Sequence, residues 1–248
     1  MRRLVLLGAS NVRRGLPTVV ETARTAWGPD LEIFGAFGHG RSYGARSCIP
    51  FRCLPGILEC GLWEALAGSA PAQETAVVTD VGNDVVYGAP VPAILGWVGE
   101  CLERLAARGA AIRVTGLPVA RLRRVSPAEY LFFRTLFFRG SRVAWRRAID
   151  AVGEVDAGIR RLAAGAGATI IDPPGDWYGA DPIHVRRRDR AAAWAEILGV
   201  AKLPAPMPLG EALRLRAAAP DVRWLAGVER RRRQPAFAAP DGLRVALY

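Results

Sequence analysis

The stretch Leu4-Val5-Leu6-Leu7-Gly8-Ala9-Ser10-Asn11 decides how this chain folds. Its four consecutive apolar residues predict a strand that is buried on both faces, as the strands of parallel sheets are. Small residues then end the strand within one turn. Because ligands of open parallel sheets gather at the carboxyl ends of the strands, we expect Ser10 at an accessible edge of the sheet.

Similar apolar runs alternate with helical patterns along most of the chain. Four further strands are expected at residues 31–37, 76–81, 111–117 and 168–172. The clearest helical pattern is 92–108, where apolar residues recur at helical spacing. This alternation predicts an α/β protein with three α/β/α layers and a flavodoxin-like, five-stranded parallel sheet.

The sequence changes character after residue 199. Three prolines between 204 and 208 precede a short Leu-Arg helical pattern, and Arg230–Arg233 is a basic run. We therefore expect a domain of residues 1–199, followed by a Pro/Arg-rich C-terminal appendage of residues 200–248. Within this appendage, residues 242–248 are a candidate for one more strand.

Composition excludes several classes of protein. The 248 residues are 51% hydrophobic and 23% charged, which is typical of a globular protein. No apolar run approaches the roughly 18 residues of a membrane span, so none is expected. Only four apolar residues follow Arg2 and Arg3, too few for an export signal, and a cytoplasmic location is therefore expected.

The formal net charge of +11 comes almost entirely from arginine, since Lys202 is the only lysine. One interpretation is an anionic partner: nucleic acid, a lipid headgroup or an acidic substrate. The other is a composition generally rich in Arg, Ala and Gly. The arginines are scattered in pairs and triplets along the chain, which favours the second interpretation, and no nucleic-acid partner is expected. The sequence carries no signal for the oligomeric state.

The four cysteines, at positions 48, 53, 60 and 101, form no C-x-x-C pair. His39 and His184 are the only histidines, so no metal site and no cofactor are expected. A disulfide between Cys48 and Cys53 is conceivable, but the expected cytoplasmic location argues against it.

Four polar or glycine-containing segments follow predicted strands: Gly8–Asn11, Gly38–Ser42, Gly82–Asp84 and Asp181–His184. Hydrolysis of an ester by serine needs a nucleophile, a base, a group that orients the base, and donors aimed at the oxyanion. Ser10, His184 and Asp181 are candidates for the first three roles.

These blocks, in this order, resemble those of the SGNH (GDSL-like) hydrolase superfamily, and the resemblance spans residues 4–198. It implies a flavodoxin-like fold and a serine esterase that works through an acyl-enzyme. It assigns a catalytic triad of Ser10, Asp181 and His184, and an oxyanion hole formed by Ser10, Gly40 and Asn83. The sequence departs from the family pattern at two places. Ala9 stands where the family usually has Asp, and no Asn precedes the glycines of the second block. Gly38 is an alternative to Gly40 as the oxyanion donor.

The predicted function is cleavage of a carboxylic ester that carries a short- to medium-chain acyl or acetyl group. Acyl transfer, or non-catalytic binding of an anionic ligand on the same scaffold, are the alternatives. His39 and Arg41 are weaker candidates for contact with the substrate, because both flank Gly40. Nucleotide-binding enzymes are disfavoured, because the chain has neither Gly-Lys-Ser/Thr nor Tyr-x-x-x-Lys.

Leu131–Phe138 is an aromatic helical segment that follows a capping box, Ser126–Glu129. Packing into the core is the commoner fate of such residues, and it predicts a small site with a preference for short acyl groups. In the alternative arrangement the segment covers the site and supplies an acyl pocket.

Overall fold

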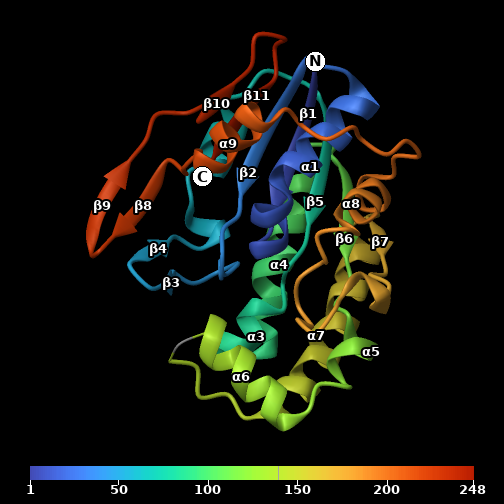
Figure 1. Cartoon of the computed structure of the whole chain (residues 1–248), viewed down its shortest axis with the longest axis vertical. Coiled ribbons are helices and arrows are strands. Elements are labelled where there is room, and N and C mark those ends of the chain that lie inside the picture. The colour runs from blue at the N-terminus through green and yellow to red at the C-terminus, as the bar shows by residue number, and fades with distance from the viewer. Residues whose placement is uncertain (139) are drawn as a thin grey trace.

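The computed structural model describes residues 1–138 and 140–248, and a seven-stranded sheet forms its centre (Figure 1). The strands, in spatial order, are β10 (Phe237–Ala238), β11 (Arg244–Leu247), β2 (Leu31–Ala36), β1 (Arg2–Leu7), β5 (Gln73–Val78), β6 (Ala111–Thr115) and β7 (Thr169–Ile171). Neighbours from β11 to β7 are parallel, whereas β10 runs antiparallel to β11.

The order β2-β1-β5-β6-β7 is the predicted flavodoxin-like arrangement. In the register of the sheet, Leu7 at the end of β1 lies between Ala36 of β2 and Val78 of β5. The carboxyl ends of these three strands are therefore level. Segments that follow them in the sequence emerge together at one edge of the sheet.

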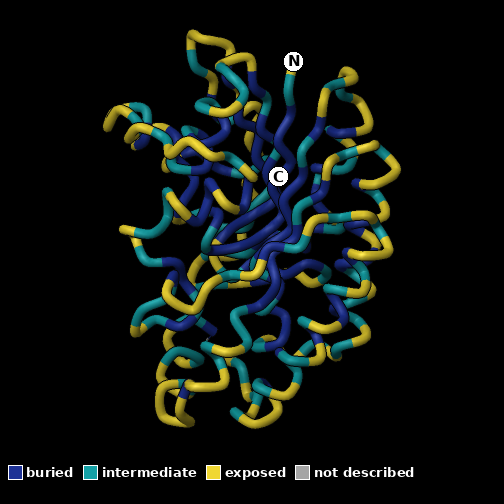
Figure 2. Tube along the Cα trace, turned by 90° about the vertical axis from the view of Figure 1, so that its right-hand side faces the viewer, coloured by how far each residue is buried: buried dark blue, intermediate teal, exposed yellow. Residues whose placement is uncertain are grey.

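Helices cover both faces of the sheet and complete three layers. One face carries α1 (Ser10–Trp27), α8 (Arg190–Leu198) and α9 (Leu209–Ala217); the other carries α2 (Leu62–Ala67), α4 (Val91–Ala106) and α7 (Trp145–Gly165). Leu4 and Leu6 pack with the first group, and Val5 and Leu7 pack with the second. This alternation makes β1 apolar throughout, and Figure 2 shows the buried centre that results.

The remaining short helices gather largely around the carboxyl edge of the sheet (Figure 1). They are η1 (Ile57–Glu59), α3 (Asn83–Tyr87), α5 (Val119–Leu122), α6 (Pro127–Phe137) and η2 (Gly175–Trp177). The predicted capping box begins α6: the Glu129 amide donates to Ser126 Oγ, and the Ser126 amide donates to Glu129 Oε2.

The strand count differs from the predicted five, because the C-terminal segment adds β10 and β11 to the sheet. The candidate strand at 242–248 is β11, and its buried Val245 and Leu247 cover the edge of β2 that would otherwise be open. The same segment contributes α9, which packs on α1.

A second, antiparallel sheet lies beside the first and has the order β3-β4-β8-β9. It joins β3 (Ser47–Ile49) and β4 (Arg52–Leu54) to β8 (Val222–Leu225) and β9 (Val228–Arg231). Cys48 and Cys53 pair across β3 and β4 and form a disulfide. The expectation that they stay unbridged was wrong, because the antiparallel register places the two side chains opposite each other. Among the described residues, no helix is both long and apolar enough to cross a membrane.

Candidate active site

Ser10 is the first residue of α1, three residues beyond the end of β1. The turn is tight: a Cβ on Gly8 would lie 2.7 Å from the side chains of both Thr79 and Val12. Only glycine therefore fits between the strand and the following helix without displacing a neighbour. The Ser10 side chain faces a cavity at the carboxyl edge of the sheet, as the sequence predicted.

His184 and Asp181 lie next to Ser10. His184 Nε2 is 2.8 Å from Ser10 Oγ, and His184 Nδ1 is 2.6 Å from Asp181 Oδ2. The backbone amides of Ile183 and His184 donate to Asp181 Oδ1 at 3.1 and 3.2 Å. The D-x-x-H segment is thus a closed turn that aims the carboxylate at the imidazole of its own histidine.

Asp181 is held in the ionised form that this arrangement needs. Its partial burial by itself would raise the pKa of the carboxyl. The hydrogen bond to His184, the charge of that ring and the Ile183 amide act in the opposite direction, and the net effect lowers the pKa of Asp181. A carboxylate at His184 Nδ1 fixes the tautomer in which Nε2 can accept the proton of Ser10.

Two residues that the sequence did not single out, Asp80 and Asn11, organise this site. Asp80 Oδ2 accepts hydrogen bonds from the amides of Ala9 and Asn11, on either side of Ser10, at 2.9 and 3.0 Å. Asn11 Nδ2 donates to Asp80 Oδ1 and to the Ile183 carbonyl, and Asn11 Oδ1 accepts from the Val185 amide. The sequence did contain a signal for Asp80: it lies two residues after the end of β5, and therefore at the same edge of the sheet as Ser10.

The three predicted oxyanion donors make fewer hydrogen bonds within the protein than Ser10, His184 and Asp181 make among themselves. Among the described residues, the backbone amides of Ser10 and Gly40 have no hydrogen-bond partner. Asn83 lines the same cavity as Ser10, and its Nδ2 makes one long hydrogen bond, 3.4 Å, to the Arg41 carbonyl. Gly40 is next to Arg41 and has a φ of 66°; a Cβ there would lie 2.7 Å from the Tyr87 hydroxyl. Ser10 and Asn83 therefore share the cavity, whereas Gly40 is not part of its lining.

Of the two weaker candidates, the structure places neither in the cavity lining. Arg41 is fully buried, and its guanidinium donates to the carbonyls of Pro55 and Tyr248, so it holds loops together and does not face a substrate. His39 is exposed, and desolvation together with the positive charges of Arg52 and Arg13 lowers its pKa to about 4. His39 is therefore neutral at neutral pH.

Apart from its last residue, Phe138, which is buried, the aromatic segment does not enter the core, contrary to the expectation. No residue of α6 is buried, and Leu131, Phe132 and Leu136 are exposed by 50% or more. Its inner face lines the cavity with Tyr130 and Phe133, and the ring of Phe137 lies 5.2 Å from that of His184, edge to face. The helix α6 therefore covers the site. The core on this face of the sheet is occupied by the longer helices α4 and α7.

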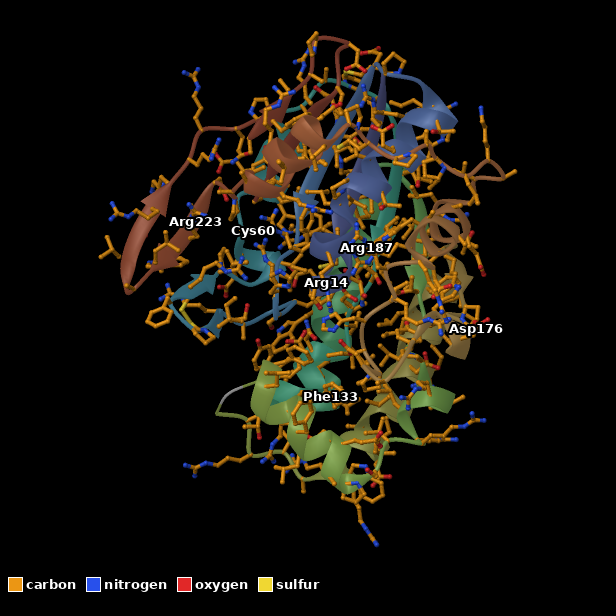
Figure 3. All side chains as sticks on the ribbon, in the orientation of Figure 1. Arg14, Cys60, Phe133, Asp176, Arg187 and Arg223 are labelled. Carbon is orange, nitrogen blue, oxygen red and sulfur yellow. A yellow bond between two sulfur atoms is a disulfide. The ribbon has the colours of Figure 1, made fainter. Side chains whose placement is uncertain are left out.

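The cavity is predominantly apolar. Besides Ser10 and Asn83, its lining includes aliphatic and aromatic side chains from the segments that surround the carboxyl edge: Leu117, Leu122, Val125, Tyr130, Phe133, Phe138, Val152, Trp177, Ile183 and Ile197. Phe133 points inward from α6 (Figure 3). Among the described residues, no group of three His, Cys, Asp or Glu side chains is arranged to hold a metal ion.

No protein-family model and no curated protein sequence matches this chain. Several solved structures do match it. The acetyl xylan esterase AlAXEase aligns over 81% of this chain and 100% of its own, with a TM-score of 0.54 and 11% identity. The psychrotrophic esterase EstA from Pseudoalteromonas sp. aligns over 78% of this chain and 93% of its own, with a TM-score of 0.50 and 11% identity. The predicted resemblance is thus confirmed as a shared SGNH-type α/β/α fold.

Proposed function

We propose that this chain is a serine esterase that cleaves carboxylic esters of medium-length acyl chains through an acyl-enzyme. The single observation that carries the proposal is the hydrogen-bonded series of Ser10, His184 and Asp181, with separations of 2.8 and 2.6 Å. A nucleophile, a base and an orienting carboxylate in this order are the parts that acyl transfer to serine requires.

In this mechanism His184 Nε2 accepts the proton of Ser10 as Oγ attacks the ester carbonyl. The negative charge that develops on the carbonyl oxygen is met by the amides of Ser10 and Gly40 and by Asn83 Nδ2. The imidazolium, paired with Asp181, then returns the proton to the leaving oxygen. Water, deprotonated by His184, releases the acyl group from Ser10 and restores the enzyme.

The preference for medium acyl chains follows from the apolar cavity under α6. Each methylene transferred from water into such surroundings contributes about 0.8 kcal/mol, so kcat/KM should rise with chain length until the cavity is filled. An acetyl group would leave most of the lining, Phe133 and Leu117 included, without a contact.

The test is a series of p-nitrophenyl esters from acetate to palmitate, measured with the unaltered chain and with Ser10→Ala. We expect kcat/KM to increase from acetate to octanoate, and Ser10→Ala to lower it on the order of a thousandfold or more. Turnover that survives Ser10→Ala would exclude the serine mechanism. A preference for acetate would exclude the acyl pocket and leave the serine mechanism intact.

A further inference from the structure

Seven arginines surround the side of the site on which His184 lies. They come from five separate parts of the chain, and we call them the rim arginines: Arg13, Arg14, Arg52, Arg187, Arg190, Arg216 and Arg223. Arg13 and Arg14 follow Ser10 within the first turns of α1, and Arg187 and Arg190 follow His184. Figure 3 shows Arg14 and Arg187 near each other in the view, with Phe133 below them.

Hydrogen bonds and one ion pair connect several of these arginines to the backbone of other rim arginines, to the loop of His39 and to Asp181. Arg14 Nη1 is 3.6 Å from Asp181 Oδ2, and Arg190 Nη1 donates to the Arg14 carbonyl at 3.1 Å. Arg13 Nη2 donates to the Arg216 carbonyl at 2.6 Å. Arg52 Nη2 donates to the carbonyl of His39 at 3.1 Å, beside the predicted oxyanion glycine. Repulsion between charges connects the remaining members, since Arg223 acts on Arg13 and Arg187 acts on Arg190. The rim arginines therefore form one group beside Asp181 and His184, outside the lining of the cavity itself.

The positive charge of this group is not balanced by the protein. Within residues 1–138 and 140–248, Asp181 is the one carboxylate within 4 Å of a rim arginine, and it is already shared with His184. The nearby Asp189 pairs instead with Arg186 and Arg188. Arg13, Arg52 and Arg190 each donate to a carbonyl oxygen, which uses few of the five N–H donors of each guanidinium.

The effect of this crowding is visible in the ionisation of the group. Burial, and the proximity of Arg13 and other arginines, lower the pKa of Arg52 to about 10. Burial and the charge of Arg14 lower that of Arg190. Arg52 and Arg190 remain protonated at neutral pH, and a bound anion would relieve the repulsion that lowers their pKa values.

The mechanism fixes which part of a substrate meets these charges. A carbonyl carbon carries two substituents, the acyl chain and the leaving group. The leaving oxygen must lie next to His184, because His184 Nε2 hands it the proton. The leaving group therefore extends toward the rim arginines, while the acyl chain occupies the apolar cavity beneath α6.

We propose that the substrate is an amphiphile: an acyl ester or thioester whose alcohol or thiol portion carries phosphate. The inference rests on the proposed function and deepens it. Several arginines around one opening suit a phosphate group, because the guanidinium fork matches its oxygens and the charge is multiple. The phosphate itself is unchanged in the reaction: the Ser10 Oγ–acyl bond forms, the bond from the acyl carbon to the leaving oxygen or sulfur breaks, and the leaving atom takes the proton from His184.

Matched substrates that differ only in phosphate test the proposal. One pair is 1-octanoylglycerol and its 3-phosphate; the other is S-octanoyl pantetheine and octanoyl-coenzyme A. The two pairs distinguish a lipid headgroup from a nucleotide-linked thiol as the source of the phosphate. In at least one pair we expect the phosphorylated member to have a kcat/KM about tenfold higher at low ionic strength, with the preference declining as salt screens the charges.

Arginine variants connect that preference to the rim. Arg187→Gln and Arg190→Gln should each reduce the ratio of kcat/KM between the phosphorylated and neutral members. Arg161→Gln, an exposed arginine of α7 outside the rim, is the matched control and should keep the ratio. Equal kcat/KM within both pairs, or a ratio that all three variants leave unchanged, would overturn the inference. Hydrolysis of p-nitrophenyl octanoate, which carries no phosphate, distinguishes the two proposals. If the unaltered chain hydrolyses it but shows no preference for phosphate, only the inference about phosphate fails. If the unaltered chain does not hydrolyse it, the proposed esterase function and the inference both fail.

Discussion

Asn11 Oδ1 accepts a hydrogen bond from the backbone nitrogen of Val185 at 2.9 Å, so the residue after Ser10 holds the residue after His184. The Asn11 amide group donates at the same time to the Ile183 carbonyl at 2.9 Å, on the other side of His184. Its second acceptor is Asp80, whose carboxylate also holds the backbone around Ser10. One side chain thereby sets the distance between Ser10 and His184, which are far apart in the sequence.

Replacement of Asn11 should therefore impair chemistry more than binding. Asn11→Ala removes both contacts with the His184 segment, and we expect kcat to fall roughly 10- to 100-fold while KM changes little, because misplacement of a reacting group raises the barrier. Asn11→Asp keeps an acceptor for Val185 but loses the donor and adds a charge beside Asp80, so it should not restore kcat. Steady-state kinetics with a p-nitrophenyl ester and a thermal melt of each variant provide the measurement. A change confined to KM or to the melting temperature would argue against a positioning role.

Asn83→Ala tests the third oxyanion donor. The amide of Asn83 has one long contact in the protein and faces the cavity with Ser10, so its removal should cost the transition state a hydrogen bond and leave the fold intact. We expect kcat to decrease roughly a hundredfold or more. An unchanged kcat in a variant that melts normally would remove Asn83 from the oxyanion hole.

Phe133→Ala tests the role of α6 in substrate choice. Phe133 lines the cavity, whereas its neighbour Phe132 is 61% exposed and does not. We expect Phe133→Ala to lower kcat/KM for octanoate esters about tenfold and to affect acetate esters far less, because only the longer chain reaches this ring. Phe132→Ala is the matched control. Equal losses on acetate and octanoate would mean that Phe133 acts through the fold.

Asp84 provides a pH-dependent test of stability. Its carboxyl is 1% exposed, and burial raises its pKa to about 6, against roughly 4 in the unfolded chain. Between these two values the folded state holds a proton that the unfolded state has lost. The contribution of Asp84 to the free energy of unfolding therefore decreases as pH rises from about 4 to about 6, by roughly 2–3 kcal/mol, and is constant above that.

Asp84→Asn should abolish this contribution while its side-chain oxygen still accepts from the Tyr43 amide. Denaturant unfolding at pH 4.5, 6 and 8 is the measurement. The variant should gain stability relative to the unaltered chain as the pH rises. Asp150→Asn, at an exposed position on α7, should show no such trend. Parallel pH profiles for Asp84→Asn and the unaltered chain would contradict the raised pKa.

The sequence by itself determined the central sheet, its parallel order and the residues that meet at its carboxyl edge. These features are local: an apolar run specifies each strand, Gly8–Asn11 adjoins the end of β1 directly, and Gly82–Asp84 and Asp181–His184 lie in the segments that follow β5 and β7. Once parallel strands are level, residues that follow them must converge, so no long-range information was needed to predict that Ser10 and His184 approach each other.

The tertiary structure alone decided where α6 lies, how β11 closes the sheet and which polar groups hold the site together. An aromatic helix with two apolar faces has no periodicity that distinguishes the core from a cover over a cavity. The contacts of Asn11 with Asp80 and Val185 join residues distant in sequence, and the rim arginines come from five segments. Such groupings depend on packing between elements. Hydrophobic periodicity shows which face of an element is buried, but it does not show which other element packs against that face.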